Sequence, residues 1–298
     1  MKLCRFHAVG QNKSTRQRAT ADISARVGLL TREEKSVIDL SSGGVQRLDE
    51  LLEDNTLAKS LVRLSREKLP KHKLTEVQLL APVDEQEVWA AGVTYLRSKA
   101  ARMDESEFSA SAYDRVYVAK RPELFFKSMA HKVADPDSAV GIRRDAKWNV
   151  PEPELALVFN SRGLLAGYTI GNDMSSRDIE GENLLYLPQA KIYNRSCALG
   201  PFIVVGGTEA AARRWTISIT IEREDKEVFV GDTRASRIKR TFAELQDYLF
   251  RSQTFPKGAV LLTGTGVVPP DDFTLRRNDV VAISISGIGT LRNTVALV

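Results

Sequence analysis

Short apolar segments of strand length recur from about Val77 to the end of the chain, and turn-forming residues separate them. Such segments between turns predict β-strands rather than helices. Asn160-Ser161-Arg162-Gly163 lies between two of them and predicts a hairpin turn. We expect strands at 88–93, 155–159, 164–170, 197–205, 216–223, 226–230, 259–263 and 279–285, and a short strand or bend at 124–128.

Helical patterns are few. A helix is expected over residues 45–68, after the turn-forming residues 41–44. Its leucines fall near helical spacing: Leu48, Leu51, Leu52, Leu57, Leu61 and Leu64. Residues 98–115 are charged and low in glycine and proline, and they predict a second helix, a candidate lid over a substrate. A third helix is expected over residues 242–251.

The change of pattern along the chain predicts two domains. Residues 1–75 are polar and mixed in pattern, and residues 69–73 have the composition of a linker. We therefore expect a small N-terminal α/β domain at 1–75 and a catalytic domain, mostly β, at 76–298. This α+β organisation argues against a doubly wound dinucleotide fold, since no phosphate-binding glycine motif follows a strand.

Composition narrows the class of protein. The chain has 298 residues with 43% hydrophobic content, enough for a buried core, and no apolar run near the roughly 20 residues of a membrane span. The net charge is +5, but the basic residues are scattered, and the cluster at 237–240 lacks interleaved aromatics. Nucleic-acid binding is therefore not favoured, whereas a small acidic substrate would be attracted.

Two cysteines, Cys4 and Cys197, cannot form a disulfide framework or a cysteine zinc cage. The first seven residues include charges and do not resemble a secretory signal. Both observations favour a cytoplasmic location.

Three carboxylates provide the candidate chemistry. Glu152 and Glu154 are two residues apart on a predicted strand and project from one face. If Ser161-Arg162 is a two-residue hairpin loop, Asp173 falls opposite Val150. On that register Asp173 is the diagonal neighbour of Glu152, roughly 7–8 Å away between Cα atoms.

Three converging carboxylates repel one another unless a cation lies between them. Oxygen ligands suit Mg²⁺, with Mn²⁺ or Ca²⁺ as alternatives. Mg²⁺ binds about six oxygens, which leaves about three positions for water or for the two oxygens of a 2-keto acid. Seen alone, a Glu-x-Glu pair is more often a solvated face, and a lone aspartate at a strand end is usually a turn residue.

Four motifs recur in one known superfamily: residues 122–127 (Pro-Glu-Leu-Phe-Phe-Lys), the Glu152/Glu154 pair, residues 171–178 (Gly-Asn-Asp-Met-Ser-Ser-Arg-Asp) and residues 263–266 (Thr-Gly-Thr-Gly). With them, the sequence resembles the fumarylacetoacetate hydrolase superfamily over most of residues 80–298. The resemblance implies a mixed β-sandwich roll, Mg²⁺ bound by Glu152, Glu154 and Asp173, and assembly as a homodimer or homotetramer.

Within the superfamily, residues 180–193 and the spacing from Glu154 to Asp173 are similar to dehydratases of 2-keto-3-deoxy-D-arabinonate. This resemblance implies a lyase of pentose degradation that forms 2,5-dioxopentanoate (α-ketoglutarate semialdehyde). Hydrolase members usually carry a histidine and a glutamate that activate water, where this chain has Ser98 and Ala101. Neither can act as a base near neutral pH, so hydrolysis is disfavoured and loss of water is favoured.

The resemblance assigns Lys191 as the base that removes the C3 proton of a 2-keto acid polarised by the cation. The acid that protonates the leaving C4 hydroxyl stays open among Glu123, Glu180 and Glu182. The residues expected to contact substrate are Thr265, Lys127, Arg97 and Glu123.

Structural roles are the alternatives for several of these residues. Lys191 would by default be a surface lysine, Thr265 a turn residue and Tyr95 a packing residue. Arg177 and Asp178 are expected to form a buried ion pair that supports the site. Rival functions are hydrolysis of an acylpyruvate or another diketo acid, decarboxylation of an oxaloacetate-like acid, and non-catalytic binding of a keto acid.

Overall fold

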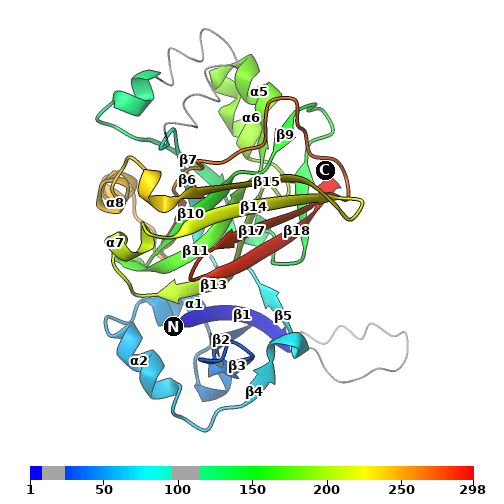
Figure 1. Ribbon diagram of the computed structural model, residues 1–298. Coiled ribbons are helices and arrows are strands. Elements are labelled where there is room, and N and C mark those ends of the chain that lie inside the picture. The colour runs from blue at the N-terminus through cyan, green and yellow to red at the C-terminus, as the bar shows by residue number, and fades with distance from the viewer. Residues whose placement is uncertain (9–23, 96–113) are drawn as a thin grey trace.

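The computed structural model describes residues 1–8, 24–95 and 114–298, and strands dominate it (Figure 1). The largest sheet in this part of the chain has eleven strands in the order β4-β3-β2-β1-β13-β11-β10-β16-β6-β7, with β5 paired to β1. Its strands are β1 (Lys2–Ala8), β2 (Arg26–Leu30), β3 (Ser36–Asp39), β4 (Lys71–Lys73), β5 (Val77–Leu80), β6 (Glu87–Gly92), β7 (Glu123–Ser128), β10 (Pro153–Phe159), β11 (Leu165–Asp173), β13 (Cys197–Val205) and β16 (Ala259–Leu262).

A second sheet packs on the first. Its order is β15-β14-β17-β18-β8, and a separate pair joins β12 to β9. Alternating isoleucines of β14 and β17 meet Leu155 and Leu157 of β10 in one buried core, as in a β-sandwich. These strands are β8 (Ala139–Ile142), β9 (Asn149–Val150), β12 (Ser175–Ser176), β14 (Thr216–Arg223), β15 (Lys226–Arg234), β17 (Val280–Ile285) and β18 (Gly289–Leu297).

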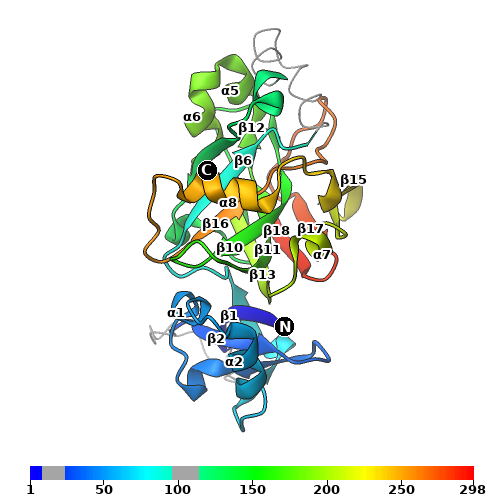
Figure 2. The ribbon, with the colours of Figure 1, turned by 90° about the vertical axis from the view of Figure 1, so that its left-hand side faces the viewer.

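The helices are short. Helix α8 adds Phe242, Leu245 and Leu249 to the sandwich core, and Figure 2 shows it crossing the face of the strands. Helices α5 and α6 lie at the end of the molecule remote from the N-terminal strands (Figures 1 and 2). The α-helices that lie wholly within the described residues are α1 (Leu48–Leu52), α2 (Leu57–Leu64), α5 (Arg177–Glu182), α6 (Leu187–Lys191), α7 (Glu209–Ala212) and α8 (Phe242–Phe250). The 3-10 helices are η1 (Leu40–Gly43), η2 (Leu74–Glu76), η3 (Ala130–Lys132), η4 (Leu184–Tyr186) and η5 (Ala235–Arg237).

Most predicted strands of the catalytic region are confirmed. The structure has β13 and β14 with the predicted bounds, and β15 continues past the predicted end at residue 230 to Arg234. The predicted helix at 98–115 lies almost entirely outside the described residues. An α+β organisation with mixed sheets and few helices is confirmed.

The N-terminal part differs from the prediction in detail. The single helix expected at 45–68 is two helices, α1 and α2, because the Asp54 carboxylate accepts hydrogen bonds from the backbone N–H of Thr56 (2.6 Å) and its hydroxyl (2.8 Å). Such an aspartate turn competes with the helical hydrogen bonds and interrupts the helix. Residues 71–73 of the expected linker form β4, which pairs with β3.

The large sheet extends through both expected domains. In Figures 1 and 2 the blue and cyan N-terminal part lies below the rest of the molecule. Strand β1 pairs with β2 on one side, and on the other side it pairs first with β13 and then with β5. The division into two domains at residue 75 therefore stays a prediction, and strands from both sides of it belong to one hydrogen-bonded sheet.

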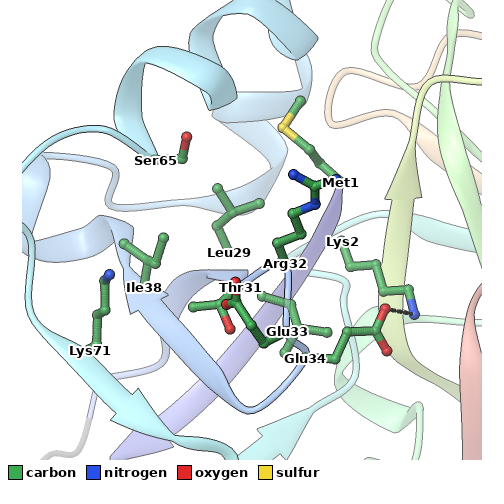
Figure 3. A pocket seen from close by; sticks show the side chains of 11 residues that line it. Met1, Lys2, Leu29, Thr31, Arg32, Glu33, Glu34, Ile38, Ser65 and Lys71 are labelled. Atoms are coloured by element: carbon green, nitrogen blue, oxygen red, sulfur yellow. Dashed lines mark ion pairs between the residues drawn. The ribbon is translucent and has the colours of Figure 1, made fainter.

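A hollow of about 520 Å³ opens in this N-terminal part (Figure 3). Leu29 and Ile38 contribute apolar lining, and Lys2 and Glu34 form an ion pair of 2.6 Å beside it. All its lining residues belong to the first 75 residues, so it shares none with the carboxylate site described below. In the described ranges, no helix has the length and apolar character needed to cross a membrane.

Candidate metal centre and active site

The hairpin of β10 and β11 brings the predicted carboxylates together. Glu152 and Asp173 lie directly opposite each other and exchange both backbone hydrogen bonds, at 3.2 and 3.0 Å. Glu154 follows Glu152 on the same face and pairs with Gly171. The predicted register, with Asp173 opposite Val150, is therefore wrong by two residues.

Two local features cause the difference. The turn closes between Asn160 and Leu164, one residue later than predicted, because the Asn160 side chain accepts the N–H groups of Arg162 (3.1 Å) and Leu164 (3.0 Å). A bulge between Val158 and Phe159 adds a second residue. Since side chains alternate with a period of two, a shift of two keeps Asp173 on the face of the glutamates.

The three carboxylates form a compact buried cluster. Glu152, Glu154 and Asp173 are each at most 3% exposed, and one oxygen from each lies within 4.8 Å of the others. Burial raises the pKa of the Glu154 carboxyl well above its usual range, and the neighbouring Asp173 and Glu152 carboxylates raise it further. The cluster is thus strained electrostatically unless positive charge is close.

Lys191, the predicted base, supplies part of that charge. It ends α6 and is fully buried. Its Nζ lies 2.9 Å from Oε2 of Glu152 and 3.5 Å from Oδ2 of Asp173, and it donates a hydrogen bond of 2.5 Å to the Ser175 hydroxyl. The structure therefore places this amine within the carboxylate cluster, not on the surface.

Lys127 lies in the same cluster and is also fully buried. Its Nζ forms an ion pair of 2.5 Å with Oδ1 of Asp173 and donates to the backbone carbonyls of Met174 (3.0 Å) and Lys191. These contacts tie β7 to the end of β11 and to α6. Lys127 was expected to contact substrate, and its contacts in this structure are with Asp173 and with two backbone carbonyls.

Arg177 pairs with a different partner from the one predicted. Its Nη2 lies 2.6 Å from Oε1 of Glu152, whereas the Asp178 carboxylate accepts the backbone N–H of Lys147 at 2.6 Å. The expected Arg177–Asp178 ion pair is therefore wrong. The reason is the start of α5 at Arg177, directly after β12, which brings the guanidinium to Oε1 of Glu152, while Lys191 contacts Oε2.

The Thr-Gly-Thr-Gly segment closes another side of the site. The backbone N–H of Gly264 donates to Oε2 of Glu154. Thr265 lines the same pocket as Glu152, Glu154 and Asp173, and its hydroxyl donates to the Val267 carbonyl at 2.9 Å. Gly264 has φ +87°, and a Cβ there would lie 2.1 Å from the Thr94 hydroxyl oxygen, so a side chain is excluded.

A comparison with known protein families matches the part of the chain that holds this site. Residues 87–296 match the family described as fumarylacetoacetate (FAA) hydrolase C-terminal. The chain belongs to the fumarylacetoacetate hydrolase family. Its matched region includes the three carboxylates, both buried lysines and the Thr-Gly-Thr-Gly segment.

Among family members, the chain is 48% identical over 217 residues to the probable 2-keto-3-deoxyxylonate dehydratase of Haloferax volcanii, covering 73% of this chain and 74% of that protein. It is 38% identical over 226 residues to the 2-dehydro-3-deoxy-D-arabinonate dehydratase of Saccharolobus solfataricus, covering 75% and 76%. A solved 2-keto-3-deoxy-D-arabinonate dehydratase complexed with magnesium and 2,5-dioxopentanoate superposes with a TM-score of 0.79 at 30% identity, covering 100% of this chain and 99% of that one.

Glu123 lies at the edge of the family site. It begins β7 opposite Gly92 of β6, and Gly92 lines the carboxylate pocket. A Cβ at Gly92 would come within 1.9 Å of the Glu123 carboxylate, so the absence of a side chain leaves room for that carboxylate beside the pocket. Glu180 is buried in α5, whereas Glu182 is exposed at its end.

Of the other residues named from the sequence, Tyr95 has a definite position, whereas three lie outside the described ranges. Tyr95 is 1% exposed in the sandwich core, which confirms packing as its main contact. Arg97 lies outside the described residues, as do Ser98 and Ala101. The sequence reasoning missed Ser175 and Gly264 as contacts of the site, although both lie in motifs that carried the family resemblance.

The cluster fits a magnesium ion on its own chemistry. It offers oxygen ligands alone, which a small hard cation prefers over nitrogen or sulfur ligands. A divalent ion would remove the repulsion that raises the pKa of Glu154. Arg177 donates to one oxygen of Glu152, and the Gly264 N–H donates to one oxygen of Glu154. These hydrogen bonds orient the two carboxylates as ligands.

Proposed function

We propose that this protein is a magnesium-dependent hydro-lyase that converts a 2-keto-3-deoxy pentonate, 2-keto-3-deoxy-D-arabinonate, to 2,5-dioxopentanoate. The observation that carries the proposal is the position of Lys191, with its Nζ 2.9 Å from Glu152 inside a buried cluster of three carboxylates. The named activities of the two relatives, at 48% and 38% identity over about three quarters of the chain, support the same reaction.

Glu152, Glu154 and Asp173 would hold the Mg²⁺ ion. When bound, the ion supplies Lewis-acid polarisation of the substrate's keto group, which makes the C3 hydrogens more acidic. The residues of the chain then carry the proton transfers. Lys191 is the base, because its amine lies beside the carboxylates that would hold the ion and therefore beside the substrate's keto group.

Lys191 takes a proton from C3, and the C4 hydroxyl leaves as water with a proton from an acid. We assign that acid to Glu123, which lies beside Gly92 of the pocket, rather than to the exposed Glu182. Elimination leaves a double bond between C3 and C4. A hydrogen then moves from C5 to C3, and the resulting enol tautomerises to the aldehyde, so the net change is the loss of one water.

The sequence around residue 98 favours dehydration over hydrolysis. Ser98 and Ala101 stand where hydrolase members carry their water-activating pair.

The configuration at C4 is the one stereochemical choice left in such a substrate. Removal of the C2 and C3 centres makes the acids derived from arabinonate and xylonate differ at most at C4.

Product analysis tests the function. Purified protein with Mg²⁺ is incubated with 2-keto-3-deoxy-D-arabinonate, and the products are identified by mass spectrometry and by trapping of the aldehyde. We expect one five-carbon product, 2,5-dioxopentanoate. Two carbon fragments would indicate acylpyruvate hydrolysis, release of CO₂ would indicate decarboxylation, and binding without C3 deuterium exchange would indicate a keto-acid binding protein.

The proposal also covers the substrate contacts, the assembly and the domains of the protein. Thr265, Lys127 and Arg97 are assigned to the substrate's surroundings, on their motifs and, for the first two, on their positions at the site. A homodimer or homotetramer in the cytoplasm is the expected state of the protein, and light scattering after gel filtration measures its mass. The proposed division of the chain is a small α/β domain at 1–75 that packs on a catalytic domain at 76–298.

A further inference from the structure

The helix that carries Lys191 is too short to hold itself in place. Helix α6 has five residues, Leu187–Lys191, and its last carbonyls have no partners within the helix apart from that of Pro188, which accepts the Ile192 N–H at 2.8 Å. A helix of this length is unstable without contacts from the rest of the protein. The position of Lys191 therefore depends on what holds α6.

Two cationic side chains from other elements bind the carbonyl end of α6. Nη1 of Arg143 donates to the Gln189 carbonyl at 3.0 Å, and Nζ of Lys127 donates to the Lys191 carbonyl. Lysine and arginine at a helix C-terminus satisfy free carbonyls and interact favourably with the helix dipole. Arg143 follows β8 and Lys127 lies in β7, so α6 is fixed from two directions.

Arg143 is itself held rigidly. Its Nε and Nη2 lie 2.8 and 2.6 Å from the two carboxylate oxygens of Asp145, a bidentate pair. Its guanidinium carbon lies 5.7 Å from the centre of the Tyr193 ring, two residues beyond Lys191. The Arg143 side chain is 19% exposed, unlike the fully buried Lys127, so it can be replaced without opening the core.

We propose that Arg143 is a positioning residue that orients the amine of Lys191 by fixing the carbonyl end of α6. Arg143 has no contact with Glu152, Glu154 or Asp173 among the described residues, so it acts on the base through the backbone and leaves the metal ligands alone. The inference rests on the proposed function where it takes Lys191 as the base. It adds a residue that neither the carboxylate cluster nor the family motifs include.

The test uses Arg143→Gln, Arg143→Lys and the matched control Arg144→Gln in the full-length protein. Arg144 is exposed, carries the same charge, and has no side-chain contact with the described part of α6. We expect kcat for dehydration to fall roughly ten- to a hundredfold in Arg143→Gln, because a misplaced catalytic group costs rate steeply. KM and Mg²⁺ affinity by calorimetry should stay within about twofold, since the proposed metal ligands lie outside α6, in β10, in β11 and directly before β10.

Arg143→Lys should recover part of the lost rate, since an ammonium can still donate to the Gln189 carbonyl. Arg144→Gln should match the wild type. Arg143→Gln with wild-type kcat, or with kcat, KM and Mg²⁺ affinity all degraded and no recovery in Arg143→Lys, would overturn the proposal. The second result would mark Arg143 as a general structural residue.

A readout independent of turnover separates this inference from the proposed function. Amide hydrogen exchange of the peptide spanning residues 184–193 should be faster in Arg143→Gln than in wild type and Arg144→Gln. If the wild type does not dehydrate the substrate but this peptide still loosens, the function is wrong and the anchoring of α6 stands. If exchange is unchanged, the anchoring itself is wrong, whatever the activity.

Discussion

At the scale of single residues, the site is a balance of buried charges. Lys127, Lys191 and Arg177 compensate the three carboxylates, and their cationic groups lie 2.5 to 3.5 Å from Glu152 and Asp173. Breaking such a cluster by removing one member leaves an uncompensated buried charge, which is costly. Substitutions here must therefore be read by several measurements at once.

Lys191→Ala should abolish turnover and leave Mg²⁺ bound. The amine is the proposed base, whereas the three ligand carboxylates lie in β10, in β11 and, for Glu152, directly before β10, and they keep their backbone pairing. We expect kcat to fall by about 10³-fold or more, within the range of a general base and its positioning. Calorimetry with Mg²⁺ is the control. Near-wild-type turnover would show that Lys191 is not the base.

Mg²⁺ should stabilise the protein more at higher pH. The pKa of Glu154 is raised by burial and by Asp173 and Glu152, so the folded state without metal holds a proton that the unfolded state has lost. Its stability therefore falls as pH rises from the ordinary glutamate pKa through the raised one. Mg²⁺ binding releases that proton. Thermal melts at pH 6 and pH 8 should show the larger Mg²⁺-induced rise in Tm at pH 8; equal shifts would contradict the assignment.

The two cysteines should be unreactive in the folded protein. Cys4 and Cys197 are fully buried, and burial raises the pKa of each thiol to about 12. At pH 8 a thiol of that pKa is ionised to only about one part in 10⁴, and the thiolate is the reactive form. A thiol reagent should therefore label about two cysteines only after denaturation. Rapid labelling of the native protein would show that one of them is accessible.

At the scale of elements, the hairpin shows what the sequence could and could not predict. The apolar segments 155–159 and 164–170 on either side of the turn predicted both strands correctly, and the period of two along a strand predicted the shared face of the carboxylates. The predicted register was wrong for two reasons: the Asn160 side chain lengthens the turn, and the pairing shifts at a bulge between Val158 and Phe159. The apolar pattern indicates neither the longer turn nor the bulge. The two one-residue shifts add to two, so the prediction that the carboxylates share one face remained correct.

Elements with mixed polarity were harder to predict. Strand β1 alternates Lys2, Arg5 and His7 with buried Leu3 and Phe6, and it was not predicted, because its sheet neighbours come from distant parts of the chain. The break between α1 and α2 rests on one aspartate turn. The site residues that motifs carried were located, whereas Ser175, Gly264 and Arg143 depend on contacts that appear only in three dimensions.

Gly264→Ala should weaken both stability and Mg²⁺ binding. The backbone at Gly264 has φ +87°, and a Cβ would meet the Thr94 hydroxyl oxygen at 2.1 Å, so the segment must shift and its N–H must leave Glu154. We expect a loss of about 1–3 kcal/mol in unfolding free energy. Gly206→Ala is the matched control, since φ is +75° but nothing lies within 4 Å of its Cβ. Equal Mg²⁺ affinities in the two variants would remove Gly264 from the site.

At the scale of the whole molecule, one sheet joins the N-terminal strands to the catalytic ones. Leu3 of β1 and the leucines of α1 and α2 share a core with Ala156, Leu199 and Val260 behind the carboxylate hairpin. The N-terminal part thus covers a face of the catalytic sheet. The proposed boundary at residue 75 separates sequence patterns more sharply than it separates packed surfaces.

A fragment of residues 76–298 should retain the metal ligands but lose solubility. Removing residues 1–75 exposes the edge of β13 that pairs with β1 and the apolar face beneath α1 and α2. We expect the fragment to aggregate at concentrations where the full chain does not, as gel filtration would show. A soluble, monodisperse fragment that binds Mg²⁺ would support two independent domains.

The exchanged backbone hydrogen bonds between Glu152 and Asp173 have a kinetic consequence. They lock the two strands side by side, so the acidic groups cannot drift apart when no ion is present. Binding of Mg²⁺ then requires only that the three carboxylate groups rotate and that the Lys191 amine moves out of the cluster. Stopped-flow mixing should accordingly record a single fast uptake phase, without the slow second phase that folding of a ligand loop would introduce.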